Sequence, residues 1–218
     1  MIFSSMPSGT RRHKVRKTLP AIAVICSGEG TNLQAILNTV KKRSLSARVA
    51  VVISDKENAN ALNRAKRAGV EARFINPSDY ATREDFEKKI VAVLKSHSVK
   101  LVCLAGFMRI LTPYFINAFS KRILNVHPAL LPAFPGVRAI DDALGWGVKV
   151  TGVTVHFVDA LIDHGPIILQ EAVPIKPHDT KETLHSRIQK VEHRLYPTAI
   201  SLVLEGRVRI KGRTVKIK

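Results

Sequence analysis

AIAVICSGEGTNLQAI, residues 21–36, is the stretch that decides the fold. Residues 21–27 form an unbroken apolar run, which is typical of a strand buried on both faces of a parallel sheet. The glycine turn GEG follows, and from about Thr31 apolar residues recur at helical spacing. A buried strand that passes through a glycine turn into a helix predicts the first unit of an α/β sheet.

The same alternation continues along the chain. We expect further strands at 47–54, 71–76, 99–106 and 121–126, with helices at 58–68 and 78–96 and a short helical piece before residue 121. Two longer strands at 148–158 and 165–175 follow, and then a long helix with Asp179 as its N-cap and Glu182 three residues on. Pro197 is expected to end or kink that helix, which continues into AISLVLEG, and short strands at VRI and TVKI close the chain. This order predicts a doubly wound, mostly parallel sheet in a single domain.

The positive charge is concentrated at the two ends of the chain. The net charge is +18, and residues 1–19 and 206–218 carry eleven basic residues and no acid, which leaves +7 for residues 20–205. We expect a disordered basic tail at 1–19, a folded domain at 20–210 and a basic tail at 211–218. Such tails attract nucleic acid non-specifically. No basic face with interleaved aromatic residues is visible, so we expect no specific nucleic-acid partner.

Several protein classes are disfavoured by composition and motifs. No apolar run is long enough for a membrane span, so no membrane partner is expected. Residues 1–20 lack the apolar core of a secretory signal, although a transit peptide remains an alternative. Cys26 and Cys103 lie inside apolar runs, which indicates buried thiols and a reducing, cytoplasmic setting. The histidine spacing predicts no metal site, and no G-x-S-x-G elbow is present.

The glycine turn is a candidate phosphate site. Backbone N–H groups at the start of a helix suit an anion, and Thr31 and Asn32 add further donors. Gly28 and Gly30 fit a dinucleotide fingerprint, but Leu33 stands where the third glycine belongs. A tight turn without a ligand is the alternative interpretation.

Two loops carry proton-competent side chains amid apolar residues. LNVHPALLPAFPG, residues 124–136, holds Asn125 and His127 in a proline-stiffened backbone, and Asp163 lies in the loop between the two longer strands. An imidazole can move a proton near neutral pH, and an amide N–H can hold a developing oxyanion. We expect Asp163 to face His127, to orient the ring and to raise the pKa of the imidazole. Together the three side chains predict a site for acyl chemistry. Taken separately, His127 could be an ordinary loop histidine and Asp163 an ordinary turn aspartate, which is the alternative interpretation.

The fourth strand ends in a further candidate surface, LAGFMRILTPYF at 104–115. Ligands of open α/β sheets bind outside the carboxyl ends of the strands. Met108, Ile110 and Leu111 could line a flat apolar slot for an aromatic ring system, with Arg109 nearby. Core packing is the alternative for these side chains.

Five motifs together resemble the phosphoribosylglycinamide formyltransferase family: SGEGTNLQAI, LAGFMRIL, NVHPALLPAFPG, GVTVHFVDALIDHGPI and VEHRLYP. They occur in order over residues 20–210. The resemblance implies a Rossmann-like formyltransferase fold and transfer of the formyl group of 10-formyltetrahydrofolate to the amine of glycinamide ribonucleotide in purine synthesis. The segment at 137–141, Val-Arg-Ala-Ile-Asp, departs from the histidine-bearing stretch common in the family.

Site roles follow from the resemblance position by position. Asn125, His127 and Asp163 match the catalytic residues. The ribonucleotide would contact Gly30, Thr31, Asn32, Gln189, Lys190, Val191 and Glu192, with Glu192 at the glycinamide end. The folate would contact Arg83, Met108, Arg109, Ile110, Leu111, Asn125, Asp159, Ala160, Leu161, Ile162 and Asp163. No metal cofactor is implied, and the protein is expected to be a monomer or a homodimer.

Other interpretations share part of these motifs. Formyltetrahydrofolate deformylase has the same Asn, His and Asp but uses water as acceptor, and it carries an added N-terminal domain that twenty residues cannot form. Methionyl-tRNA formyltransferase shares the chemistry but carries a C-terminal domain, for which the twelve residues after Gly206 are too few. A non-catalytic nucleic-acid-binding protein on this fold is a third alternative. Leu33 argues against an NAD-dependent dehydrogenase.

Overall fold

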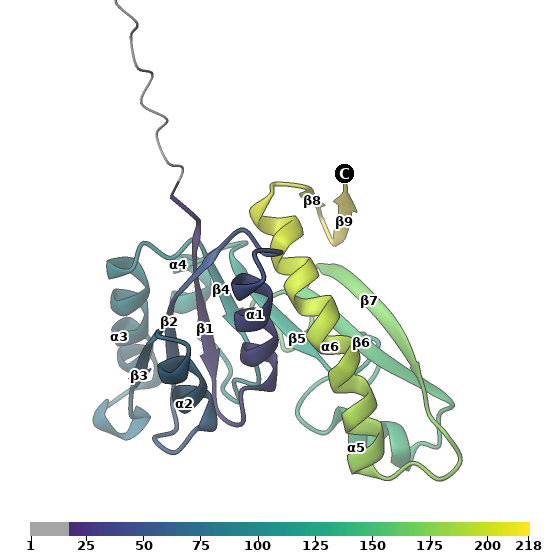
Figure 1. The fold of residues 1–218 in the computed structure, drawn as a ribbon. Helices are drawn as coiled ribbons and strands as arrows, with labels where there is room; N and C mark the ends of the chain where they lie inside the picture. The colour runs from purple at the N-terminus through teal and green to yellow at the C-terminus, as the bar shows by residue number, and fades with distance from the viewer. Residues whose placement is uncertain (1–17) are drawn as a thin grey trace, which may run out of the picture.

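The computed structural model describes residues 18–218, so the predicted basic tail at 1–19 lies, apart from its last two residues, outside the described part of the chain. Seven strands form one sheet in the order β3-β2-β1-β4-β5-β6-β7. The first five strands of that order pair in parallel, whereas β6 pairs antiparallel with both β5 and β7. The prediction of a mostly parallel sheet in one domain is confirmed (Figure 1).

The elements follow the predicted order. The strands of the sheet are β1 (Ala21–Cys26), β2 (Arg48–Ser54), β3 (Glu71–Phe74), β4 (Leu101–Leu104), β5 (Ile123–His127), β6 (Val150–Phe157) and β7 (Ile167–Pro174). The helices are α1 (Thr31–Lys41), α2 (Asn60–Arg67), α3 (Arg83–Ser96), α4 (Pro113–Ala118), α5 (Ala139–Gly145) and α6 (Lys181–Leu204), with a 3₁₀ turn η1 (Pro77–Asp79). A separate hairpin is formed by β8 (Val208–Lys211) and β9 (Thr214–Ile217).

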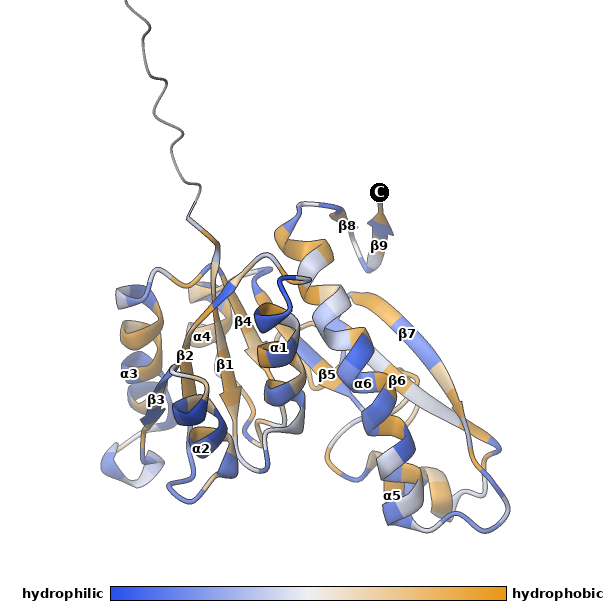
Figure 2. Cartoon of the chain, viewed as in Figure 1, coloured by the Kyte–Doolittle hydropathy of each residue, from blue (hydrophilic) through white to orange (hydrophobic). Residues whose placement is uncertain are grey.

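The central strand β1 is buried on both faces, as its apolar run predicts. Ile22 and Val24 belong to a core under α1, α2 and α6, whereas Ala23 and Ile25 belong to a second core under α3 and α4. Figure 2 shows the same arrangement as apolar strands between helices whose polar faces point outward. Within residues 18–218, none of the helices has both the length and the apolar character needed to cross a membrane.

Two helix predictions differ from the structure. Thr180, not Asp179, caps α6 by accepting the Thr183 N–H, because the Asp179 carboxylate is held by Arg187 at 2.7 Å. The α6 helix continues past Pro197 to Leu204, as the AISLVLEG stretch predicts. The helix predicted from residue 78 begins only at Arg83, after the η1 turn.

The parallel strands β1, β2, β4 and β5 all end at the same edge of the sheet, the lower edge in Figure 1. Their loops therefore meet there, which is where open α/β sheets bind ligands. Tyr196 of α6 fixes the helix across this sheet by donating its hydroxyl to the carbonyls of Leu104 and Leu124, at 2.8 and 3.0 Å.

Candidate active site

The three side chains predicted to form the reactive centre lie together. Asn125 and His127 come from the end of β5, and Asp163 comes from the loop between β6 and β7. The His127 Nδ1 atom is 3.3 Å from Asp163 Oδ2, and Asn125 Nδ2 donates to Asp163 Oδ1 at 3.3 Å. The predicted pairing of His127 with Asp163 is thus present in the structure.

The pKa of His127 differs from the prediction. Its Nε2 atom lies 2.8 Å from the Phe134 carbonyl and its Nδ1 atom 3.3 Å from Asp163 Oδ2, so both ring nitrogens face oxygen acceptors. Burial lowers the pKa of His127 below its ordinary value, and this outweighs the opposite effect of the Asp163 charge. The predicted rise in the pKa of His127 is therefore wrong for the folded protein, because burial disfavours the imidazolium more than one carboxylate favours it.

Asp163 is fixed by several donors. The Gly136 N–H donates to its Oδ2 atom at 2.8 Å, and its backbone is left-handed, with φ 48°. Burial by itself would raise the pKa of Asp163. The neighbouring His156 and His127 imidazoles and the Gly136 N–H instead lower the pKa to about 2. The carboxylate is consequently ionised at neutral pH.

His156 is a fourth polar residue of this centre that the sequence interpretation missed. It lies directly across from Asn125 in the antiparallel β5–β6 pair and is only 2% exposed. Its Nδ1–H donates to the Phe157 carbonyl at 2.8 Å, which leaves Nε2 to accept from Asn125 Nδ2 at 3.3 Å. Both N–H groups of the Asn125 amide are thereby engaged, one with His156 and one with Asp163.

The proline-rich loop after β5 is held from beneath by two polar side chains. Thr154 on β6 donates to the Ala129 carbonyl at 2.7 Å and accepts the Leu131 N–H at 3.1 Å. Gln170 on β7 donates to the Leu131 carbonyl and to the Thr154 hydroxyl, at 2.8 and 2.9 Å. These bonds fix the loop that supplies the Phe134 carbonyl and the Gly136 N–H to the centre.

The glycine turn and the middle of α6 meet although they are far apart in sequence. Asn32 Nδ2 donates to Glu192 Oε2 at 2.8 Å, and Gln189 donates to the Thr31 hydroxyl at 3.4 Å. Glu192 is buried, and burial raises its pKa more than the Asn32 hydrogen bond lowers it. The structure therefore joins the two segments predicted to bind one substrate, whereas Lys190 is exposed and Val191 is half-buried between them.

The surface predicted to bind folate has exposed apolar side chains on two loops: Met108, Ile110, Leu161 and Ile162. Leu111, by contrast, is 8% exposed and packs in the core under α3 and α4. The loop after β4 is tied to β1 by Met108, whose N–H donates to the Ser27 hydroxyl at 3.1 Å. It is tied to α3 by Thr112, whose N–H donates to the buried Glu87 at 2.9 Å.

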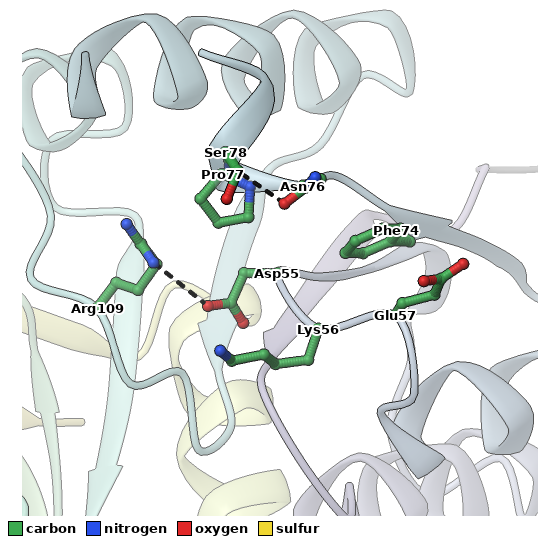
Figure 3. A pocket seen from close by; sticks show the side chains of 8 residues that line it. All are labelled: Asp55, Lys56, Glu57, Phe74, Asn76, Pro77, Ser78 and Arg109. Carbon is green, nitrogen blue, oxygen red and sulfur yellow. Dashed lines mark hydrogen bonds and ion pairs between the residues drawn. The ribbon is translucent and has the colours of Figure 1, made fainter. Parts of the chain in front are cut away.

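Arg109 turns its side chain into a cavity of about 400 Å³ at the same edge of the sheet (Figure 3). Its Nη1 atom is 3.9 Å from Asp55 Oδ2, and its guanidinium lies over the Phe86 ring at 5.4 Å. Lys56 also lines this cavity. The cavity thus combines two cations with two carboxylates, those of the buried Asp55 and of Glu57.

The loop that carries Asp163 is fastened at its outer side by the C-terminal hairpin. His164 Nδ1 lies 2.8 Å from Asp159 Oδ2, and Arg213 Nη1, in the β8–β9 turn, lies 2.7 Å from His164 Nε2. Donation from Nδ1 to Asp159 leaves Nε2 free to accept from Arg213. Asp159 and Asp163 therefore lie at opposite ends of one short, tethered loop, with the exposed residues Ala160, Leu161 and Ile162 between them.

Comparison with known proteins gives the family of the chain. A family described as formyl transferase matches residues 21–200. The chain belongs to the formyl transferase family. The phosphoribosylglycinamide formyltransferase of Bacillus subtilis (strain 168) is 42% identical over 182 residues, which cover 84% of this chain and 93% of that protein.

Two further proteins are similar to this chain. The trifunctional purine biosynthetic protein adenosine-3 of Gallus gallus is 45% identical over 204 residues, which cover 94% of this chain but only 20% of that protein. The chain thus spans about a fifth of the trifunctional relative. The crystal structure of glycinamide ribonucleotide transformylase 1 from Symbiobacterium toebii superposes with a TM-score of 0.90 at 52% identity, over 91% of this chain and 94% of that one.

One residue predicted to bind the folate, Arg83, has no described contact with the rest of the site. Arg83 is exposed at the start of α3, and no hydrogen bond or ion pair within residues 18–218 joins it to the folate surface.

Within residues 18–218, no group of three or more His, Cys, Asp or Glu side chains could hold a metal ion. Cys26 and Cys103 are both free and buried.

Proposed function

We propose that this chain transfers the formyl group of 10-formyltetrahydrofolate to the amine of glycinamide ribonucleotide, in the cytoplasm, as a step of purine biosynthesis. The observation that carries the proposal is the meeting of Asn125, His127 and Asp163 at the sheet edge that also holds the 30–32 turn. The names of the relatives at high coverage agree with this activity. Either a monomer or a homodimer could carry out this reaction, because the residues proposed for the site come from one chain.

The spacing of the strands supports binding of an extended phosphorylated amine. β4 lies between β1 and β5, so the turn after β1 is separated from Asn125 and His127 by two strand spacings, roughly 10 Å. A ribonucleotide phosphate at the N–H groups of Gly30, Thr31 and Asn32 would therefore leave its amine near the reactive centre. Glu192, which is bound to Asn32, lies where it can accept from the glycinamide end.

The folate would lie between the loop after β4 and the loop at 159–163. Met108 and Ile110 on one side, with Leu161 and Ile162 on the other, offer apolar surface to a planar ring system. Lys56 and Arg109 in the adjoining cavity suit the carboxylates at the glutamyl end of the folate.

The chemistry then requires stabilisation of one oxyanion and transfer of one proton. The amine attacks the formyl carbon, a new C–N bond forms, and negative charge grows on the formyl oxygen. Asn125 donates an N–H to that oxygen; its bond to Asp163 is long, at 3.3 Å, and is the one that the oxygen replaces. When the C–N bond to the folate breaks, the proton lost by the amine reaches the folate nitrogen, with His127 or a water as the carrier.

His127 acts in this scheme as a base that becomes an acid. Its lowered pKa leaves the imidazole neutral at the start, able to accept a proton at Nδ1. The Asp163 carboxylate beside Nδ1 then stabilises the imidazolium that forms.

The test is to mix the protein with 10-formyltetrahydrofolate and one of three acceptors: glycinamide ribonucleotide, water alone or methionyl-tRNA. Folate release that requires the ribonucleotide, with one formylated product per folate, is the expected result. Release at the same rate without any added acceptor would identify a deformylase. Release that depends on methionyl-tRNA alone would also refute the proposal.

A further inference from the structure

The α2 helix holds the glycine turn by the turn's carbonyl oxygens. The Ala61 N–H donates to the Gly28 carbonyl at 3.1 Å, and Arg64 Nε donates to the Glu29 carbonyl at 2.8 Å. Asn60 adds a bond from Nδ2 to Glu29 Oε2 at 3.0 Å. All three donors lie on the first turns of α2, so the turn is fixed by a helix that contains none of the residues assigned to the site.

The direction of these carbonyls decides where the N–H groups of the turn point. A trans peptide unit is planar, and its C=O and N–H point in opposite directions. When Arg64 draws the Glu29 carbonyl towards α2, the Gly30 N–H of the same peptide unit must point away from α2. Within residues 18–218, the N–H groups of Glu29 and Gly30 donate to no other group. They are therefore available to an anion.

The contact between the turn and α2 is too close for any residue but glycine. Gly30 is left-handed, with φ 70°, and a Cβ atom on it would lie 2.7 Å from the Cβ of Ala61. Arg64 then bridges the turn and the first helix, because its Nη1 atom also donates to Gln34 Oε1 at 3.2 Å. A planar guanidinium can donate in both directions at once, which an ammonium group cannot do with fixed geometry.

We propose that Arg64 is a positioning residue for phosphate binding: it holds the Glu29 carbonyl so that the Gly30 N–H and its neighbours face the phosphate of the ribonucleotide. The inference rests on the proposed function, in which the 30–32 turn binds that phosphate. Arg64 itself touches no substrate in this scheme. Its effect is to order the donors before the ligand arrives, which improves binding and leaves the chemical step alone.

The variants Arg64→Gln and Arg64→Lys test this role, with Arg67→Gln as the matched control. Arg67 lies on the same helix, is exposed and makes no hydrogen bond or ion pair with any residue from 18 to 218. For Arg64→Gln we expect the KM for glycinamide ribonucleotide to rise by about ten-fold, with kcat and the KM for the folate within about two-fold. Arg64→Lys is expected to recover part of the loss, and Arg67→Gln to match the parent.

Binding of inorganic phosphate gives a measurement that does not depend on turnover. Titration of the parent and the variants with phosphate, followed by the amide NMR signals of Gly30 and Thr31, is expected to show about ten-fold weaker binding for Arg64→Gln only. Equal phosphate affinity in the parent and Arg64→Gln would overturn the proposal, as would an equal rise of both KM values together with a lowered unfolding midpoint. If the parent does not formylate the ribonucleotide, the proposed function fails, while the phosphate titration still tests Arg64. Should Arg64→Gln not fold, the same comparison is made with Arg64→Lys.

Discussion

Replacement of Asp163 by Asn removes one buried charge from the reactive centre and nearly preserves its shape. The carboxylate is 11% exposed, accepts the Gly136 N–H at 2.8 Å and has its pKa lowered from 3.8 to about 2. Each pKa unit corresponds to about 1.4 kcal/mol, so the ionised carboxylate stabilises the folded state by about 2 kcal/mol at neutral pH. Asp163→Asn is expected to lose that amount, which is about a thirty-fold change in the unfolding equilibrium.

The pH dependence gives this prediction its sign. Because the pKa of Asp163 is lower in the folded than in the unfolded chain, the stabilisation is complete above the unfolded pKa and is lost as the pH falls towards about 2. Urea unfolding of the parent and Asp163→Asn, followed by circular dichroism at about pH 7, 5 and 3, should therefore show a gap that narrows with acid. Turnover of the variant should fall by about a hundred-fold or more, since His127 loses the charge that stabilises its imidazolium.

Asp142→Asn is the control for this experiment. Asp142 lies on α5 and, among residues 18–218, pairs only with the exposed Arg138, at 3.6 Å, so its replacement should change neither stability nor turnover. A gap between parent and Asp163→Asn that stays constant from neutral to acid pH would refute the charge argument. It would mean that shape or hydrogen bonding alone explains the loss.

Three further substitutions test separate parts of the site. His127→Ala should lower turnover by about a hundred- to a thousand-fold with the fold retained by circular dichroism, and a loss of only a few-fold would remove His127 from the reaction. Glu192→Gln should raise the KM for the ribonucleotide by more than about ten-fold, because a neutral amide attracts an amine less. Its urea midpoint should stay equal or rise, since burial already raises the pKa of Glu192 and Gln carries no charge to desolvate; a large drop would contradict that view. Arg213→Ala should raise the KM for the folate by only about two- to five-fold, because its contact with His164 is exposed, and an unchanged KM would exclude any role of the hairpin in ordering the 159–163 loop.

Features that depend on neighbours in sequence were predictable. The apolar run at 21–27 gave a strand with two buried faces, and the Asn-x-His spacing placed two polar side chains at the end of β5. Both follow from local periodicity and from the rule that ligands bind at the carboxyl edge of a parallel sheet. Capping was less predictable: Asp179 and Thr180 are both good N-caps, and only the distant Arg187 removes Asp179 from that role.

His156 was missed although a signal was present. It stands in a strand expected to be apolar, and antiparallel pairing of the strands at 121–126 and 148–158 puts it opposite Asn125. If the two strands had been aligned as an antiparallel pair by their hydrophobic alternation, His156 would have been placed next to Asn125 in the reactive centre. The sequence alone does not show whether these two strands pair in parallel or antiparallel, so the pairing of His156 with Asn125 was not predicted.

The amino-acid sequence by itself determined the order of strands and helices, the edge at which the reactive side chains lie and their chemical types, because these depend on local pattern and on covalent chemistry. Only the tertiary structure decided the direction of the His127 pKa shift, the engagement of both Asn125 N–H groups and the hydrogen bonds from α2 to the glycine turn. Each of these depends on how deeply a group is buried and on which distant groups surround it. Burial and direction are properties of the packed chain, and no local stretch of sequence contains them.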